Sequence, residues 1–234
     1  MELDYLTFDK MRKSYLLKGI HSSICSLFLS KPFIEFLSYY GRKFYMKPIL
    51  NHPVLVMIDV QKGFEEEKWG ERNNLQAEKN MEQLLSTWRL KRLPIIHVQH
   101  LSQDSDSSFY PGKPGVDFKE FAKPLKGEML IQKRVNSAFI GTNLEEHLKQ
   151  KGLNHVVIAG LTTPHCVSTT TRMSGNLGFN TFLISDATAA FGITGPNDVY
   201  YSPDEVHNLS IATLQGEFAT VLTTRELMDS FDRT

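Results

Sequence analysis

The stretch Pro53-Val-Leu-Val-Met-Ile-Asp59 is a short, almost wholly apolar run that ends in an acid. A continuous apolar run of this length is typical of a strand covered on both faces, as in a parallel sheet. Similar short runs follow at residues 94–100, 129–132, 155–159, 181–185 and 219–222. The sequence therefore predicts six strands, with Asp59 at the carboxyl end of the first.

Segments with helical signals separate these strands. Apolar residues recur at helical spacing over residues 77–92, and a further helix is expected from about His165. Capping-box sequences, which open helices, start at Thr142, Ser202 and Thr223. Because strands alternate with helices, we predict βαβ units and an α/β fold: a three-layer α/β/α sandwich around a mostly parallel six-stranded sheet.

Composition excludes several classes of protein. The 234 residues include 26 Lys and Arg and 26 Asp and Glu, so no basic excess indicates a nucleic-acid partner. The two cysteines, Cys25 and Cys166, form neither a disulfide framework nor a CxxC zinc motif. We therefore expect a cytoplasmic protein whose partner is a small molecule, with no nucleic acid and no membrane.

Residues 1–50 precede the first predicted strand. The segment Ser22–Tyr40 is apolar and aromatic, but Lys31 and Glu35 interrupt it. No uncharged run reaches the roughly 20 residues that a bilayer span needs. We expect residues 1–50 to form an N-terminal helical extension, packed on the body or on a neighbouring subunit, and residues 51–234 to form the main domain. Met46 is an alternative start that the sequence leaves open.

Three reactive residues are predicted at the carboxyl ends of strands, where open α/β sheets bind ligands. Asp59 closes the first strand, Lys133 follows the third, and Cys166 follows the turn after the fourth. A thiolate is a nucleophile, a carboxylate can accept the thiol proton, and a lysine can keep that carboxylate charged. A helix start at Cys166 would lower the pKa of its thiol. Each residue alone is more often structural, but their joint placement favours a catalytic site.

Three motifs resemble the isochorismatase-like cysteine hydrolases. They are Leu55-Val-Met-Ile-Asp-Val-Gln-Lys-Gly-Phe64, Lys133-Arg-Val-Asn-Ser-Ala-Phe139 and Val156-Val-Ile-Ala-Gly-Leu-Thr-Thr-Pro-His-Cys-Val167. The resemblance covers roughly residues 53–230 and implies the isochorismatase-like hydrolase fold for residues 51–234. It implies a catalytic triad of Asp59, Lys133 and Cys166 and a thioester intermediate.

The same resemblance carries further expectations. It implies an oxyanion hole made by the backbone N–H groups of Thr162 and Cys166, with a non-proline cis peptide bond at Leu161–Thr162. It also implies a homo-oligomer, either a dimer or a tetramer, for which the aromatic N-terminal extension would suit the interface.

Departures from the family pattern narrow the expected substrate. Nicotinamidases of this family carry an Asp-x-His…His metal cluster, whereas here His97 and His100 are three apart on a strand and face opposite ways. We therefore expect no metal and no cofactor. The family's true isochorismatases lack the cysteine, so Cys166 favours hydrolysis of a C–N bond in an amide, ureide or lactam. A C–O hydrolase of vinyl ethers and a non-catalytic binding or scaffold protein are the alternatives.

Residues close to these motifs are the candidates for binding the substrate. The main candidates are Phe64, Trp69, His100, Phe139 and His165, and further pocket candidates are Phe109, Tyr110 and Phe191. Each is also an ordinary core or loop residue type. The segment 101–126 is rich in Ser, Asp, Gly and Pro and is expected to be a long loop that acts as a lid.

Overall fold

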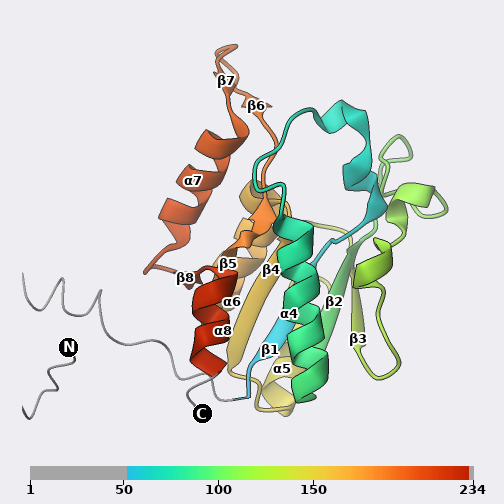
Figure 1. Cartoon of the computed structure of the whole chain (residues 1–234). Coiled ribbons are helices and arrows are strands. Elements are labelled where there is room, and N and C mark those ends of the chain that lie inside the picture. The colour runs from blue at the N-terminus through green and yellow to red at the C-terminus, as the bar shows by residue number, and fades with distance from the viewer. Residues whose placement is uncertain (1–51, 232–234) are drawn as a thin grey trace, which may run out of the picture. The chain divides into compact units, whose positions relative to one another are not determined.

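The computed structural model describes residues 52–231 (Figure 1). The expected N-terminal extension, residues 1–50, lies outside the described residues, and so does Cys25. Among the described residues, no helix combines the length and the apolar character that a membrane span requires.

Six strands form one sheet in which every neighbouring pair is parallel. The strand order is β3-β2-β1-β4-β5-β8. The strands are β1 (Val54–Ile58), β2 (Ile95–His100), β3 (Met129–Lys133), β4 (His155–Leu161), β5 (Asn180–Ala189) and β8 (Thr220–Leu222). The predicted α/β class and six-stranded sheet are therefore confirmed. A short antiparallel hairpin, β6 (Ile193–Thr194) with β7 (Tyr200–Tyr201), was not expected from the sequence.

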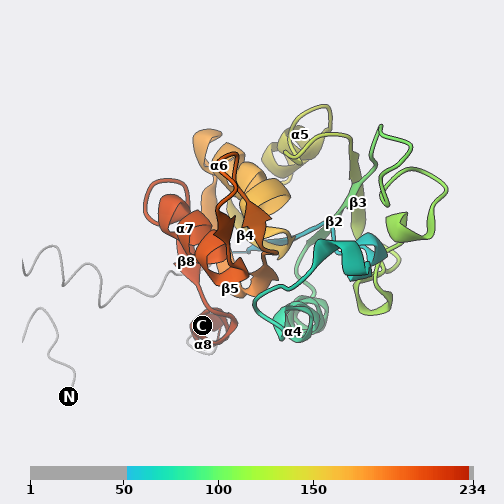
Figure 2. The same ribbon diagram turned by 90° about the horizontal axis from the view of Figure 1, so that it is seen from above.

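Helices cover both faces of the sheet, as the view from above shows (Figure 2). One hydrophobic core holds side chains from α4 and α8 against one face, and a second holds side chains from α5, α6 and α7 against the other. The helices are α4 (Ala77–Lys91), α5 (Leu144–Gln150), α6 (Ser168–Asn176), α7 (Pro203–Leu214) and α8 (Thr224–Phe231). The inner strands β1, β2 and β4 are buried on both sides, which explains their continuous apolar sequences, whereas the edge strands β3 and β8 are partly exposed.

Of the three predicted capping boxes, those at Ser202 and Thr223 are present in the structure. Ser202 forms the expected capping box with Glu205 at the start of α7, and Thr223 bonds reciprocally with Glu226 before α8. The predicted box at Thr142 was wrong. Its hydroxyl donates to the carbonyl of Ala138 at 2.6 Å, and Asn143 is the N-cap residue of α5.

Gly160 controls how closely β4 approaches β1. Its φ is +127°, and a Cβ atom built there would lie 2.1 Å from the backbone oxygen of Ile58. Gly160 therefore sets the spacing between the two strands whose ends carry Asp59 and Thr162.

We expect Gly160→Ala to lower the free energy of unfolding by about 3 kcal/mol or more, because the new methyl group meets backbone that cannot move aside. Gly152→Ala is the matched control, since Gly152 also has positive φ (+64°) but open space around it. That control should cost about 1 kcal/mol. Urea unfolding measures both, and equal losses in the two variants would contradict this role for Gly160.

Candidate active site

The candidate site lies where the strand order changes direction. From β1 the chain adds β2 and β3 on one side, and then β4, β5 and β8 on the other. In open α/β sheets, ligands bind at this point, outside the carboxyl ends of the strands. Asp59 directly follows β1, and the turn containing Cys166 follows β4.

The structure brings Asp59, Lys133 and Cys166 together. Lys133 Nζ lies 2.7 Å from Asp59 Oδ2 and donates to Cys166 Sγ at 3.2 Å. The three residues are buried, with exposed fractions of 0%, 1% and 8%. Within residues 52–231, neither carboxylate oxygen of Asp59 has a hydrogen bond of good geometry beyond this ion pair. The Cys166 thiol is close enough to influence the carboxylate as a hydrogen-bond donor, so it is the neighbour placed to give Asp59 a proton.

His100 completes the surroundings of the lysine. Its Nδ1 lies 3.0 Å from Lys133 Nζ, and the two residues are register partners in the β2–β3 pair. Asp59, His100 and Cys166 offer ligand atoms that lie within 4.8 Å of one another. Lys133 Nζ contacts all three residues, so a metal ion there would meet a positive charge at contact distance. The donor set fits an ammonium group better than a metal, and the absence of a metal stays a prediction.

His97 does not join His100. Its Nε2 lies 2.7 Å from Glu128 Oε2, and its ring packs edge-on against Phe118. The two histidines therefore have separate partners, as their spacing along the strand predicted.

Cys166 lies in an unusual turn. The peptide bond Leu161–Thr162 is cis, as expected. Residues Thr163–Val167 then form a single π-helical turn (η5), and the regular helix α6 begins at Ser168. The sequence predicted a helix from about His165, so Cys166 precedes the α-helix instead of starting it. Single π-helical turns are frequent at functional sites.

A cavity of about 180 Å³ adjoins this turn. Its lining residues are Lys68, Trp69, Thr162, Pro164, His165, Phe191, Gly192 and Ile193. Phe64 packs against Trp69 and Phe109, with ring centroids 5.4 and 4.7 Å apart. Phe109 in turn meets the ring of His100 edge-on, with ring centroids 6.1 Å apart. Aromatic side chains therefore connect the cavity with the cluster of Asp59, Lys133 and Cys166.

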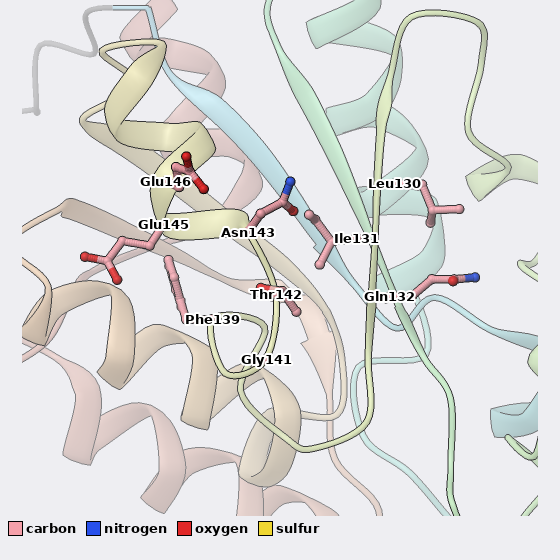
Figure 3. Close-up of a pocket in the computed structure, with 9 residues that line it drawn as sticks. All are labelled: Leu130, Ile131, Gln132, Phe139, Gly141, Thr142, Asn143, Glu145 and Glu146. Atoms are coloured by element: carbon pink, nitrogen blue, oxygen red, sulfur yellow. The ribbon is translucent and has the colours of Figure 1, made fainter.

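Of the main candidates, Trp69 and His165 line this cavity, Phe64 packs against Trp69, and His100 contacts Lys133. Phe139 lies elsewhere. It stacks on Phe179 at 6.0 Å in the hydrophobic core. It also lines a separate depression of about 540 Å³ between β3 and the start of α5 (Figure 3). Neither lining includes Asp59, Lys133 or Cys166. The smaller cavity is the one lined by residues of the turn that carries Cys166, namely Thr162, Pro164 and His165.

Comparisons of the sequence and of the fold with known proteins identify the family. Residues 53–226 match the model of the isochorismatase domain family. The chain belongs to the isochorismatase family of hydrolases. An isochorismatase-family protein of Bacillus subtilis (strain 168), YrdC, is 57% identical over 180 residues, which are 77% of this chain and 96% of YrdC. A solved isochorismatase-family structure from Chromobacterium violaceum has 39% identity and a TM-score of 0.76, covering 82% of this chain and 97% of that one.

Two polar residues of this isochorismatase-family site were missed by the sequence analysis. The thiol of Cys166 points toward Asn136 Oδ1 at 3.7 Å. The Gln61 side chain accepts from the His100 backbone N–H at 2.8 Å and donates to the carbonyls of His100 and Val116. Both lie inside or beside the quoted motifs, but nothing in their spacing marks them as site residues.

Gln61 also anchors the expected lid. Residues 101–126 contain two short 3-10 turns, Pro114–Val116 and Glu120–Ala122, and otherwise irregular backbone. Ser108, Phe109 and Phe118 are buried, so this loop packs onto the body.

The electrostatics of the site correct the expectation that the thiol pKa of Cys166 is lowered. Burial raises the pKa of the Cys166 thiol, the Asp59 carboxylate raises it further, and Lys133 opposes this only in part. The thiol of the resting site is therefore protonated near neutral pH, and the expected lowering of its pKa is wrong. Burial also raises the pKa of Asp59, although Lys133 opposes the shift. A carboxylate of raised pKa is a stronger proton acceptor than a solvated one.

This correction predicts how the thiol reacts with iodoacetamide. The alkylation rate of Cys166 should keep rising with pH above 8.5, about the pKa of a free cysteine, because the thiolate fraction is still growing there. Peptide mass spectrometry reads Cys166 separately from Cys25 across pH 6 to 10. A rate that is already constant between pH 6 and 7.5 would contradict the raised pKa.

Proposed function

We propose that this isochorismatase-family protein is a cysteine hydrolase that cleaves a C–N bond of a small-molecule amide, ureide or lactam. One observation carries the proposal: a buried thiol within hydrogen-bonding distance of a lysine that is itself paired with a buried carboxylate. A nucleophile, a proton acceptor and a group that orients the acceptor are the parts that covalent catalysis requires.

In the first step, Asp59 accepts the proton of the Cys166 thiol while Sγ bonds to the carbonyl carbon of the substrate. The carbonyl oxygen becomes an oxyanion, which the backbone N–H groups of Thr162 and Cys166 stabilise. Concerted proton transfer suits a thiol of raised pKa, since no free thiolate has to build up beforehand. Lys133 holds the carboxylate in place, and His100 accepts a hydrogen bond from the same ammonium group.

In the second step, Asp59 passes its proton to the substrate nitrogen as the C–N bond breaks. The amine leaves, and an acyl thioester on Cys166 remains. Asp59 then takes a proton from a water molecule, whose oxygen attacks the thioester carbon. The C–S bond breaks, the acid product is released, and the proton returns to the thiol.

The named relatives support cleavage of C–N bonds. Maleamate amidohydrolase of Pseudomonas putida is 28% identical over 109 residues, and ureidoacrylate amidohydrolase RutB of Variovorax paradoxus is 32% identical over 82 residues. Each match covers less than half of the relative, so these names support the reaction class and not a particular substrate.

Cysteine substitution tests the mechanism. We expect Cys166→Ala to lower ammonia release from a substrate amide by about 10³-fold or more, because no other group replaces the nucleophile. Cys25→Ser is the matched control and should keep the parent rate. Mass spectrometry of the parent, quenched during turnover, should find the acyl adduct on Cys166.

The alternatives predict other outcomes of the same experiment. Amide hydrolysis that survives in Cys166→Ala would rule out the thioester route. Vinyl-ether hydrolysis that survives in this variant would instead support a C–O hydrolase.

A further inference from the structure

We propose that His207 is a positioning residue for the oxyanion hole: from α7 it holds the turn of residues 162–166 in place through the hydroxyl group of Thr163. This inference rests on the proposed function, in which the backbone N–H groups of Thr162 and Cys166 stabilise the oxyanion. His207 acts through Thr163 and not on the substrate.

The hydroxyl group of Thr163 joins three parts of the fold. Thr163 is the first residue of the π-helical turn η5, directly after Thr162 and three residues before Cys166. Its Oγ1 lies 2.9 Å from Nδ1 of His207 on α7 and 3.1 Å from Oγ1 of Thr188 on β5. α7 also packs against this turn. One hydroxyl group therefore ties the turn both to the sheet and to α7.

All three side chains of this contact are removed from water. Thr163 and Thr188 are 0% exposed, and His207 is 6% exposed. A buried hydroxyl group without a hydrogen bond is costly, so these groups satisfy one another. Burial lowers the pKa of His207, and Asp204 opposes this only in part, so the imidazole is neutral at neutral pH.

A neutral imidazole completes the hydrogen bonds in either tautomer, because Nδ1 can accept or donate. If Nδ1 accepts, Thr163 donates to it and accepts from Thr188. If Nδ1 carries the proton, it donates to Thr163, which then donates to Thr188. An apolar side chain in place of His207 would leave Thr163 with Thr188 as its partner and remove the tie to α7.

The turn passes any movement of Thr163 on to the oxyanion donors. The carbonyl of Thr162 accepts from the backbone N–H groups of His165 and Val167, at 3.2 and 3.3 Å, so the turn is internally connected. Donors stabilise an oxyanion only when they are held where its charge develops. The Sγ atom of Cys166 has a separate contact with Lys133. Loss of the His207 contact should therefore harm oxyanion stabilisation more than the nucleophile.

Two reagents separate these two effects in a Cys25→Ser background, where Cys166 is the only cysteine. With 4-nitrophenyl acetate, Sγ bonds to the ester carbonyl carbon through an oxyanion, and 4-nitrophenolate leaves as the C–O bond breaks. With iodoacetamide, Sγ bonds to the methylene carbon and iodide leaves, with no oxyanion. In both reactions Asp59 takes the thiol proton. The burst of 4-nitrophenolate therefore depends on the oxyanion hole, and the alkylation rate does not.

We expect His207→Leu to slow the 4-nitrophenolate burst at least tenfold and to change the alkylation rate by less than about threefold. His207→Asn is the matched variant, because Asn has nearly the shape of Leu but places an amide group near the position of Nδ1. It should restore the burst to within about threefold of the parent rate. Asn208→Leu, at an exposed position of α7, should keep the parent rate.

Thr163→Val tests the same contact from the other side. It removes the hydroxyl group at nearly constant volume and should slow the burst as His207→Leu does. Because both changes break one hydrogen bond, the double variant should be no slower than the slower single variant.

An unchanged burst in His207→Leu would overturn the inference. Equal losses in His207→Leu and His207→Asn, or a burst and an alkylation rate that fall together, would overturn it as well. A burst that is absent from the parent, or that persists in Cys166→Ala, would instead overturn the proposed function.

Discussion

The buried ion pair between Lys133 and Asp59 is the interaction on which the site depends. The two charges are 2.7 Å apart and almost completely removed from water. Burying them is costly unless their geometry is held closely, and removing one partner would leave the other charge uncompensated. The pair joins the carboxyl ends of β1 and β3, which lie on either side of β2 in the sheet. His100, the last residue of β2, contacts the same ammonium group, so three adjacent strand ends are coupled through one lysine.

Burial also decides the protonation state of the site. It raises the pKa of both the Cys166 thiol and the Asp59 carboxyl, so the thiol keeps its proton at rest. In the proposed mechanism, nucleophilic attack by Cys166 therefore depends on proton transfer to Asp59 during attack and not on a thiolate formed beforehand. A resting thiol that reacts slowly with an alkylating reagent is therefore compatible with a catalytic cysteine. In this proposal the reactivity of Cys166 depends more on its position next to the base Asp59 than on a position at the start of a helix.

Paired cations occur both in the cluster around Cys166 and beside the 180 Å³ cavity. Lys68 is paired with Glu66, as Lys133 is paired with Asp59. Both cations are therefore already paired with a carboxylate, and beside Lys68 the rings of Trp69 and Phe191 stack on each other. The hydrogen bonds of Gln61 to His100 and Val116 hold the long loop against the same region.

The sequence by itself determined the sheet, most of the helices and the three strand ends that carry reactive groups. This was possible because strands buried on both faces have continuous apolar sequences, and because parallel strands end at one rim. The resemblance to the isochorismatase-like cysteine hydrolases supplied the position of the cis peptide bond at Leu161–Thr162. Only the tertiary structure decided which aromatic residues share a wall, that Phe139 belongs to the core, and that Asn136 faces the thiol. It also decided the direction of the thiol pKa, because desolvation and the distances between charges depend on packing between segments far apart in the chain.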